Sequence, residues 1–398
     1  MPVAVYVLGL AIFAQGTSEL MLSGLLTEIS GSLGVSVPQA GWLISAFAIG
    51  MLVGAPILAV VTARWSRRTA LLSFLAVFVG AHIVGALTSD YWVLLATRVL
   101  AAFVYAGFWA VASLTAVGLV RDTARGKAMS VVAGGFAVAN IAGLPGGTFI
   151  GQHLGWRAAF WAVALLAALT MICVLAMIPN TRPVEVPRVR NELRALATRP
   201  VFLLYGTTIL TTSAQMAVFA YLGVLVTEAT GMADGWVPIV LLIYGLGAVV
   251  GIAVGGRTAD AYPMRTLGVG VSALVLTLTL LALTLSHPVP TVVLAFLLGG
   301  FALGINPLLN SRVFALAPAA PTLGAAANTC AFNVGITVGP WVGGLAIGAG
   351  LDYPAVAWIG VGLAVTALGV VAWWNALSRS RSRNTIDRVD REPVSARV

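Results

Sequence analysis

The sequence VAVYVLGLAIFAQGTSELMLSGLL fills residues 3–26 and holds a single charged side chain, Glu19. A helix of this length rises about 36 Å, which is enough to cross the ~30 Å hydrocarbon core of a bilayer. The stretch lacks the basic start and the small-residue cleavage site of a secretory signal peptide. It therefore predicts a first membrane span that is retained.

Similar apolar stretches recur along the whole chain, which is 60% hydrophobic and only 9% charged over 398 residues. A soluble domain carries roughly a quarter charged residues. We therefore expect an all-α membrane protein with twelve transmembrane helices in two six-helix halves. The predicted spans are residues 3–26, 40–62, 70–88, 92–119, 128–151, 157–178, 201–226, 237–256, 266–286, 291–316, 322–349 and 353–376.

Basic residues predict the orientation of these spans. Of the 22 basic residues, 20 fall in the even-numbered loops or the tail, Arg157 falls in an odd-numbered loop, and Arg98 lies within a span. Because cytoplasmic loops are enriched in arginine and lysine, both termini are expected in the cytoplasm and the protein in the inner membrane. The net charge of +9 then faces anionic lipid, and no nucleic-acid partner is expected.

The polar segments suggest four parts. We expect a six-helix half over residues 1–180, a cytoplasmic loop over 181–200, a second half over 201–377 and a disordered basic tail over 378–398. No part is a soluble domain that could hold an active site, and nucleotide-binding and hydrolase motifs are absent, so an enzyme is not expected. Cys173 and Cys330 lie in apolar runs. We expect no metal, no cofactor and a monomer.

Glycine and proline cluster in spans 5 and 11, at Gly143, Pro145 and Gly147 and again at Gly339 and Pro340. Gly143 and Gly339 are 196 residues apart, as are Thr62 and Thr258, which indicates two parallel halves with a substrate site between them. The clusters resemble the antiporter motif of the major facilitator superfamily. Small residues let helices approach and proline permits bending; ordinary packing of small residues is the alternative.

The loop after span 2 resembles the cytoplasmic loop motif of the same superfamily. Its basic residues are Arg64, Arg67 and Arg68, while Ala63 and Ser66 stand where the motif has an acid and a glycine. The second half carries Arg257 with the acid Asp260. The resemblance implies that these five charged residues control opening of the inner face.

Glu19 is the only acidic residue well within a span, and Arg98 is the only base within one. An intramembrane charge is costly and is by default a functional hypothesis. Both lie roughly 10 Å below the outer surface, so Arg98 is expected to pair with Glu19 and to release it when Glu19 takes up a proton. The alternatives are a permanent structural pair and an arginine that snorkels to the interface.

Further polar and aromatic residues in the spans are candidates for the cavity. Each polar one is also compatible with a hydrogen bond between helices. The candidates are Gln15, Tyr105, Trp109, Gln215, Asn306, Asn310, Asn328 and Asn333.

The first 51 residues, with Phe13-Ala14-Gln15-Gly16-Thr17-Ser18-Glu19, resemble actinobacterial chloramphenicol-resistance exporters. The resemblance implies export of a neutral aromatic drug in exchange for protons. Two alternatives stay open: efflux of a sugar or other metabolite, and a membrane sensor of the same fold. A sugar site usually needs more polar groups than these spans offer, and a sensor needs a signalling domain larger than the tail.

Overall fold

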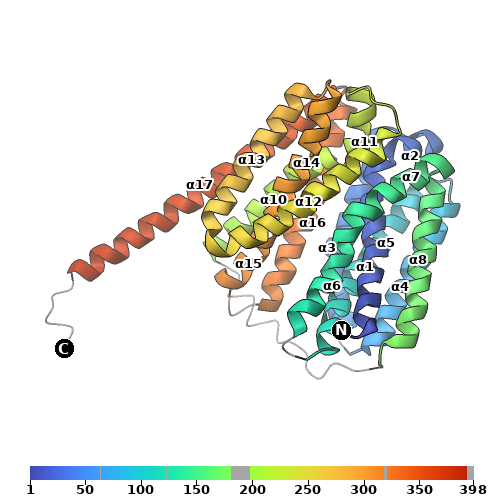
Figure 1. Cartoon of the computed structure of the whole chain (residues 1–398), viewed down its shortest axis with the longest axis horizontal. Helices are drawn as coiled ribbons and strands as arrows, with labels where there is room; N and C mark the ends of the chain where they lie inside the picture. The colour runs from blue at the N-terminus through green and yellow to red at the C-terminus, as the bar shows by residue number, and fades with distance from the viewer. Residues whose placement is uncertain (63, 122–123, 181–197, 318–320, 392–398) are drawn as a thin grey trace.

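The structure is a computed structural model that describes all residues except 63, 122–123, 181–197, 318–320 and 392–398. It is helical throughout the described ranges, and Figure 1 shows two bundles of helices side by side. The first bundle contains α1 (Val3–Leu20), η1 (Met21–Gly24), α2 (Leu26–Leu33), α3 (Val37–Val61), α4 (Arg67–Leu87), α5 (Tyr91–Gly118), α6 (Arg125–Val138), η3 (Ala139–Gly143), α7 (Leu144–Leu154) and α8 (Trp156–Met177). The second contains α10 (Arg199–Phe219), α11 (Leu222–Val224), η4 (Leu225–Ala229), α12 (Trp236–Ala261), α13 (Pro263–Thr284), α14 (Pro288–Gly304), α15 (Asn306–Leu316), α16 (Pro321–Gly348) and α17 (Pro354–Arg391).

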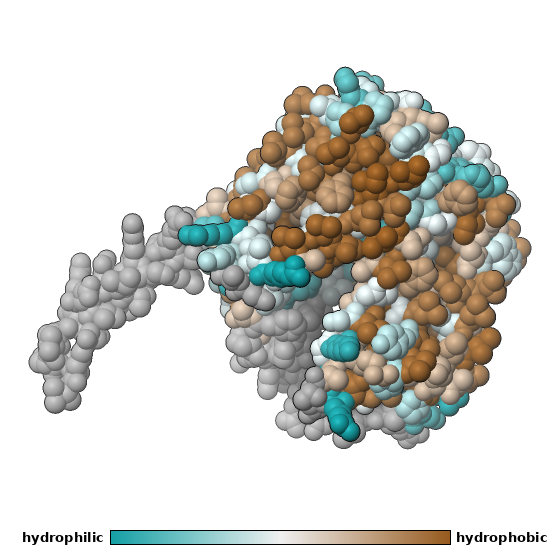
Figure 2. Space-filling model, in the orientation of Figure 1, coloured by the Kyte–Doolittle hydropathy of each residue, from teal (hydrophilic) through white to brown (hydrophobic). Residues whose placement is uncertain are grey.

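The predicted twelve spans are confirmed, because 12 helical stretches of the described chain are long and apolar enough to cross a membrane. Apolar side chains cover most of the face in Figure 2, and hydrophilic residues gather toward its upper and lower margins. On α8, Leu165, Leu169 and Ile172 are exposed at helical spacing. Such a surface is stable only where lipid replaces water around it.

Several spans are interrupted where the sequence suggests one continuous helix. Span 5 consists of α6, the π-helical turn η3 and α7, and Pro145 lies in the first turn of α7. Proline has no N–H to donate to the preceding turn, so the wider π turn accommodates it. Span 10 breaks at Ile305, just before Pro307, into α14 and α15.

The tail also differs from the expectation of disorder after residue 377. Helix α17 continues to Arg391, and residues 392–398 lie outside the described ranges. The extension contains no glycine or proline. Extending a formed helix needs no new nucleus, so a polar segment can remain helical beyond the membrane.

The two bundles meet on one side of the molecule. One end of the molecule carries the loops around residues 34, 89, 155, 234 and 287, and we call it the distal end. The N-terminus lies at the opposite end, where the two bundles are farther apart (Figure 1). Helix α3 packs against α16, and α12 against α7 and η3. Among the described residues, two hydrogen bonds join the bundles in the distal half: Ser45 Oγ donates to Thr337 O at 3.0 Å, and Gln152 Nε2 donates to Asp234 O at 3.1 Å. The distal side is therefore closed.

Gly245 offers a test of this closure. A Cβ at Gly245 on α12 would collide with the Asn140 carbonyl oxygen of η3, in the other bundle. We expect Gly245→Val to push the bundles apart, since overpacking costs about 1–3 kcal/mol, which shifts a two-state equilibrium by roughly 5-fold to 150-fold. The measurement is cross-linking of Ser45→Cys with Thr337→Cys in a chain whose native cysteines are replaced.

The control for Gly245→Val is Gly268→Val, because a Cβ at Gly268 on α13 meets nothing within 4 Å. The yield of the cross-link should fall in the Gly245 variant and stay unchanged in the Gly268 variant. Equal yields in both variants would show that the contact at Gly245 does not hold the distal side closed.

Candidate functional site

Arg98 is buried in the first bundle and contacts α1. Its Nη1 donates to Ser18 Oγ at 2.7 Å and its Nη2 to Ser18 O at 3.0 Å. The guanidinium carbon lies 4.2 Å from the centre of the Phe47 ring on α3, a cation–π contact. The Nε of Arg98 is buried without a hydrogen-bond partner. Arg98 is 1% exposed, so the interpretation that it snorkels to the interface is wrong.

His82 on α4 extends this contact into a chain of hydrogen bonds. Its Nε2 lies 2.6 Å from Ser18 Oγ, and its Nδ1 lies 2.9 Å from the Phe78 carbonyl oxygen. His82 lies within a span, so Arg98 is not the only basic side chain inside the membrane. Neither His82 nor Ser18 is among the candidate residues predicted from the sequence; the signal for His82 was an ionisable side chain in an apolar run.

Glu19 follows Ser18 at the end of α1 and is only partly buried. Its carboxylate interacts electrostatically with Arg98 and with Tyr105. The expected ion pair within 4.0 Å is not formed; the two terminal nitrogens of Arg98 donate to Ser18 instead. The structure thus brings Glu19 and Arg98 to the same level of the bundle without joining them.

Four rings, which we call the aromatic row, extend from Arg98 toward α6. Phe47 and Tyr105 have centroids 6.1 Å apart, Tyr105 and Trp109 also 6.1 Å, and Trp109 and Phe136 5.9 Å. The last two pairs meet edge to face, a favourable geometry for aromatic rings. The row includes Tyr105 and Trp109, which the sequence suggested, and adds Phe47 and Phe136.

Two candidate amides retain oxygens without a donor. Gln15 is fully buried and its Nε2 donates to Ala11 O at 3.2 Å, while its Oε1 has no partner. Asn333 is likewise buried; its Nδ2 donates to Thr329 O at 2.9 Å, and its Oδ1 has no partner. An unpaired buried oxygen costs ~1–3 kcal/mol, so each is a place where a ligand N–H or O–H would be favourable.

Three candidate amides of the second bundle, Gln215, Asn310 and Asn328, bond to protein groups. Gln215 donates to the hydroxyl of Tyr244 on α12. Asn328 Nδ2 on α16 donates to Asn310 Oδ1 on α15 at 2.8 Å, and Asn310 in turn bonds to the backbone of Asn306. These contacts fit the interpretation of hydrogen bonds between helices.

The glycine-rich face of span 5 packs against α1 beside Glu19. A Cβ on Gly147 would lie 2.9 Å from Cβ of Met21, and one on Gly143 would collide with the Thr17 side chain. Thr17 and Met21 flank Glu19, so the helix with the π turn and Pro145 lies directly against the segment that carries the carboxylate. In span 11, Gly339 packs against the α10 backbone, and the Pro340 carbonyl accepts a hydrogen bond from Tyr221 at 2.9 Å.

The basic residues at the end near the N-terminus lie elsewhere. Arg67 Nη1 donates to Leu114 O near the end of α5 at 3.0 Å, Arg68 is half-buried, and Arg64 and Arg257 are exposed. The side chain of Asp260 lies outside the described residues.

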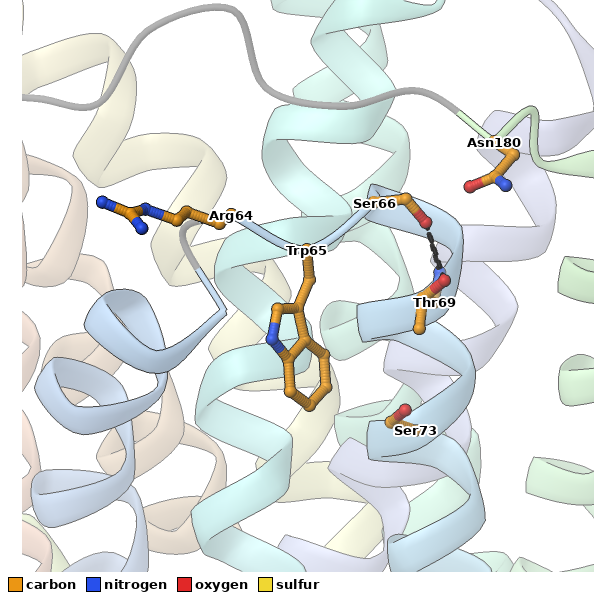
Figure 3. Close-up of a pocket in the computed structure, with 6 residues that line it drawn as sticks. All are labelled: Arg64, Trp65, Ser66, Thr69, Ser73 and Asn180. Atoms are coloured by element: carbon orange, nitrogen blue, oxygen red, sulfur yellow. Dashed lines mark hydrogen bonds between the residues drawn. The ribbon is translucent and has the colours of Figure 1, made fainter.

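Arg64 lines a cavity of about 420 Å³ with Trp65, Ser66, Thr69, Ser73 and Asn180. Figure 3 shows the Arg64 side chain directed away from the hydrogen-bonded Ser66–Thr69 pair. Thr69 precedes His82 by 13 residues on α4, about 20 Å along the helix, so this cavity is separate from the Glu19 region.

A smaller cavity of about 130 Å³ lies between the bundles at the distal end. It is lined by Glu28 from α2, Gln152 from α7 and Asp234 from the loop before α12, among others. Burial, with Asp234 adding to the effect, raises the pKa of Glu28 above its ordinary value. The protonation of Glu28 therefore changes at a higher pH than that of an exposed glutamate.

Comparisons with known proteins agree with this architecture. The sequence matches the Major Facilitator Superfamily over residues 8–242 and 224–396. It is 41% identical to a protein named chloramphenicol resistance protein in Streptomyces lividans, over 87% of this chain and 90% of that one. It is 31% identical to inner membrane transport protein YdhP of Escherichia coli K12, over 92% and 94% of the two chains.

The fold is also similar to that of a solved transporter. The crystal structure of a mutant of the nucleoside transporter NupG superposes with a TM-score of 0.76 at 14% identity, covering 93% of this chain and 98% of that one. The protein is thus a multi-pass membrane transporter for small molecules and not an enzyme, and the chain belongs to the major facilitator superfamily.

Proposed function

We propose that the chain exports a small neutral aromatic antibiotic, chloramphenicol or a close phenicol, in exchange for protons by alternating access. The observation that carries this proposal is Glu19, a carboxylate at the end of α1 without an ion pair, with Arg98 next to it but bonded to Ser18. A carboxylate in this position can gain and lose a proton without breaking a permanent salt bridge.

Proton release from Glu19 would create a negative charge beside the Arg98 guanidinium. Arg98 would then be drawn from Ser18 toward Glu19, because opposite charges attract strongly where the surroundings are apolar. The glycine face of span 5 packs on Thr17 and Met21, on either side of Glu19. A shift of α1 at this point would be passed to span 5, which contacts α12 of the other bundle. This route supports coupling between the proton and the closure of the distal side.

A neutral aromatic substrate is supported by aromatic and amide side chains of the two bundles. The aromatic row offers ring faces and edges, and the unpartnered oxygens of Gln15 and Asn333 would accept from hydroxyl or amide donors. A site with aromatic walls and few polar groups favours such a ligand. The Streptomyces lividans relative, with its name and 41% identity, supports chloramphenicol within this class.

The proposal is tested in a host that lacks its own efflux pumps. Expression of the chain should raise the inhibitory concentration of chloramphenicol but not that of cationic dyes, and a protonophore should remove the effect. Resistance to cationic dyes alone would contradict the assignment of a neutral substrate.

We also propose that the protein lies in the cytoplasmic membrane with both termini inside. Among the described residues, Arg64, Arg67, Arg257 and Arg265 lie at the ends of their spans away from the distal loops, as the charge rule requires, and Arg157 lies at the distal end. Reporter fusions at Ser378 should therefore be active in the cytoplasm, and fusions at Asp234 should be active in the periplasm. The reverse pattern of activity would contradict this orientation.

A further inference from the structure

We propose that His82 is a positioning residue for proton coupling: it holds the Ser18 hydroxyl in the orientation that binds Arg98 and keeps Arg98 away from Glu19. This inference rests on the proposed function, in which Glu19 carries the proton. It assigns a role to His82 and Ser18, neither of which was among the candidate site residues from the sequence.

The directions of the hydrogen bonds follow from the groups involved. The Phe78 carbonyl can only accept, so His82 Nδ1 carries the hydrogen and donates across 2.9 Å. In the neutral ring Nε2 is then an acceptor, and Ser18 Oγ donates to it across 2.6 Å. With its hydrogen committed to His82, Ser18 Oγ presents its lone pairs to Arg98 Nη1, which donates across 2.7 Å.

The surroundings of His82 favour the neutral ring. Phe78 lies 4.2 Å from it and Phe160 of α8 lies 5.6 Å from it, centroid to centroid. The charged or titratable groups around this chain are Arg98 and Tyr105 from α5 and Glu19 from α1. A cationic His82 would place two positive charges on a single hydroxyl group, which the positive charge of Arg98 disfavours.

Ser18 and Glu19 therefore offer two alternative positions to the same guanidinium. Ser18 binds both terminal nitrogens of Arg98 in the structure, through its hydroxyl and its carbonyl oxygen. Without His82, the Ser18 hydroxyl is free to rotate and its lone pairs are no longer fixed on Arg98. Arg98 would then move more readily to Glu19, stabilise the carboxylate and oppose its protonation.

The test measures protonation of Glu19 directly and needs no drug. Purified protein in detergent is treated with dicyclohexylcarbodiimide, which modifies protonated carboxyl groups in apolar surroundings, over a range of pH. Mass spectrometry of the peptide that carries Glu19 gives the pH at which half of the label is lost. The variants are His82→Phe, His82→Gln and Ser18→Ala, with Glu19→Gln as the blank.

We expect the midpoint of labelling to move down by about one pH unit in His82→Phe, the size of a hydrogen bond to a charged group. His82→Gln keeps an acceptor for Ser18 and should stay close to the native midpoint. Ser18→Ala should lower the midpoint, and adding His82→Phe to it should cause no further shift, because both act through one contact.

Several results would overturn the inference. One is an unchanged or raised midpoint in His82→Phe; another is an equal shift in His82→Phe and His82→Gln, which would indicate a packing role. If His82→Phe does not fold, a native midpoint in Ser18→Ala has the same meaning. Labelling of the native protein that does not depend on pH would instead contradict the proton role of Glu19 itself, and this inference with it.

Discussion

We expect Glu19→Gln to abolish export of drug against its concentration gradient while drug exchange down a gradient continues. Glutamine has nearly the shape of a protonated glutamate, but it cannot release a proton at any pH. The transporter would then still change conformation with drug bound, yet the proton gradient could do no work on it. Among the described residues the Glu19 side chain makes no ion pair within 4.0 Å and no hydrogen bond, and Arg98 keeps its two bonds to Ser18, so the fold should persist in the variant.

The measurement is drug accumulation in inverted membrane vesicles energised by a pH gradient, beside exchange of labelled for unlabelled drug without a gradient. Glu28→Gln is the matched control, since burial raises the pKa of Glu28 and it lies outside the spans. Gradient-driven accumulation should be lost in the Glu19 variant and retained in the Glu28 variant. The opposite result would assign the proton-carrying role to Glu28 of the distal cavity and would exclude Glu19 from the mechanism.

Much of the fold follows from composition alone, because each span must be long and apolar enough to cross a bilayer. The twelve predicted spans agree with the twelve helical stretches for this reason. Interruptions within spans follow less readily. Pro145 indicates a bend. Whether the backbone forms a kink or the π turn over Ala139–Gly143 depends on the helices packed against it.

The site follows only in part, because its contacts join residues far apart in the chain. Each residue of a helix adds about 1.5 Å along its axis, so the depths of Glu19 and Arg98 in the membrane can be counted from the ends of their spans. Rotation about the helix axis decides which neighbour a side chain meets, and a small error there exchanges one partner for another. Arg98 thus meets Ser18 rather than the adjacent Glu19, and His82 reaches the same hydroxyl from 64 residues away.

Export by this chain should depend on the proton gradient. We expect cells expressing the chain to gain chloramphenicol resistance that disappears when a protonophore collapses the proton gradient. Chloramphenicol is a small neutral aromatic molecule, so its movement carries no charge. Exchange of one neutral drug for one proton would move one net positive charge inward, and the membrane potential would assist export.

The transported charge determines how strongly the membrane potential changes the drug ratio across the membrane. One elementary charge across 100 mV is worth about 2.3 kcal/mol, or roughly a 50-fold change in the drug ratio that the transporter can maintain. In vesicles with a fixed pH gradient, removing the potential with valinomycin and potassium should lower the drug ratio by up to about that factor. A cationic drug exchanged for one proton would move no net charge, and its ratio would not respond to the potential.

The resistance assay in cells and the accumulation assay in vesicles test the identity of the substrate and the driving force independently. A vector without insert sets the background for resistance, and the Glu19→Gln chain shows how much resistance comes from drug binding rather than from transport. Resistance that persists in the protonophore would contradict proton coupling even if chloramphenicol is the substrate. Accumulation that needs the pH gradient but ignores the potential would instead mean that the transported species and the protons carry equal charge in opposite directions. A single carboxylate at Glu19 would then have to exchange its proton for a cation, and the neutral-drug assignment would be wrong.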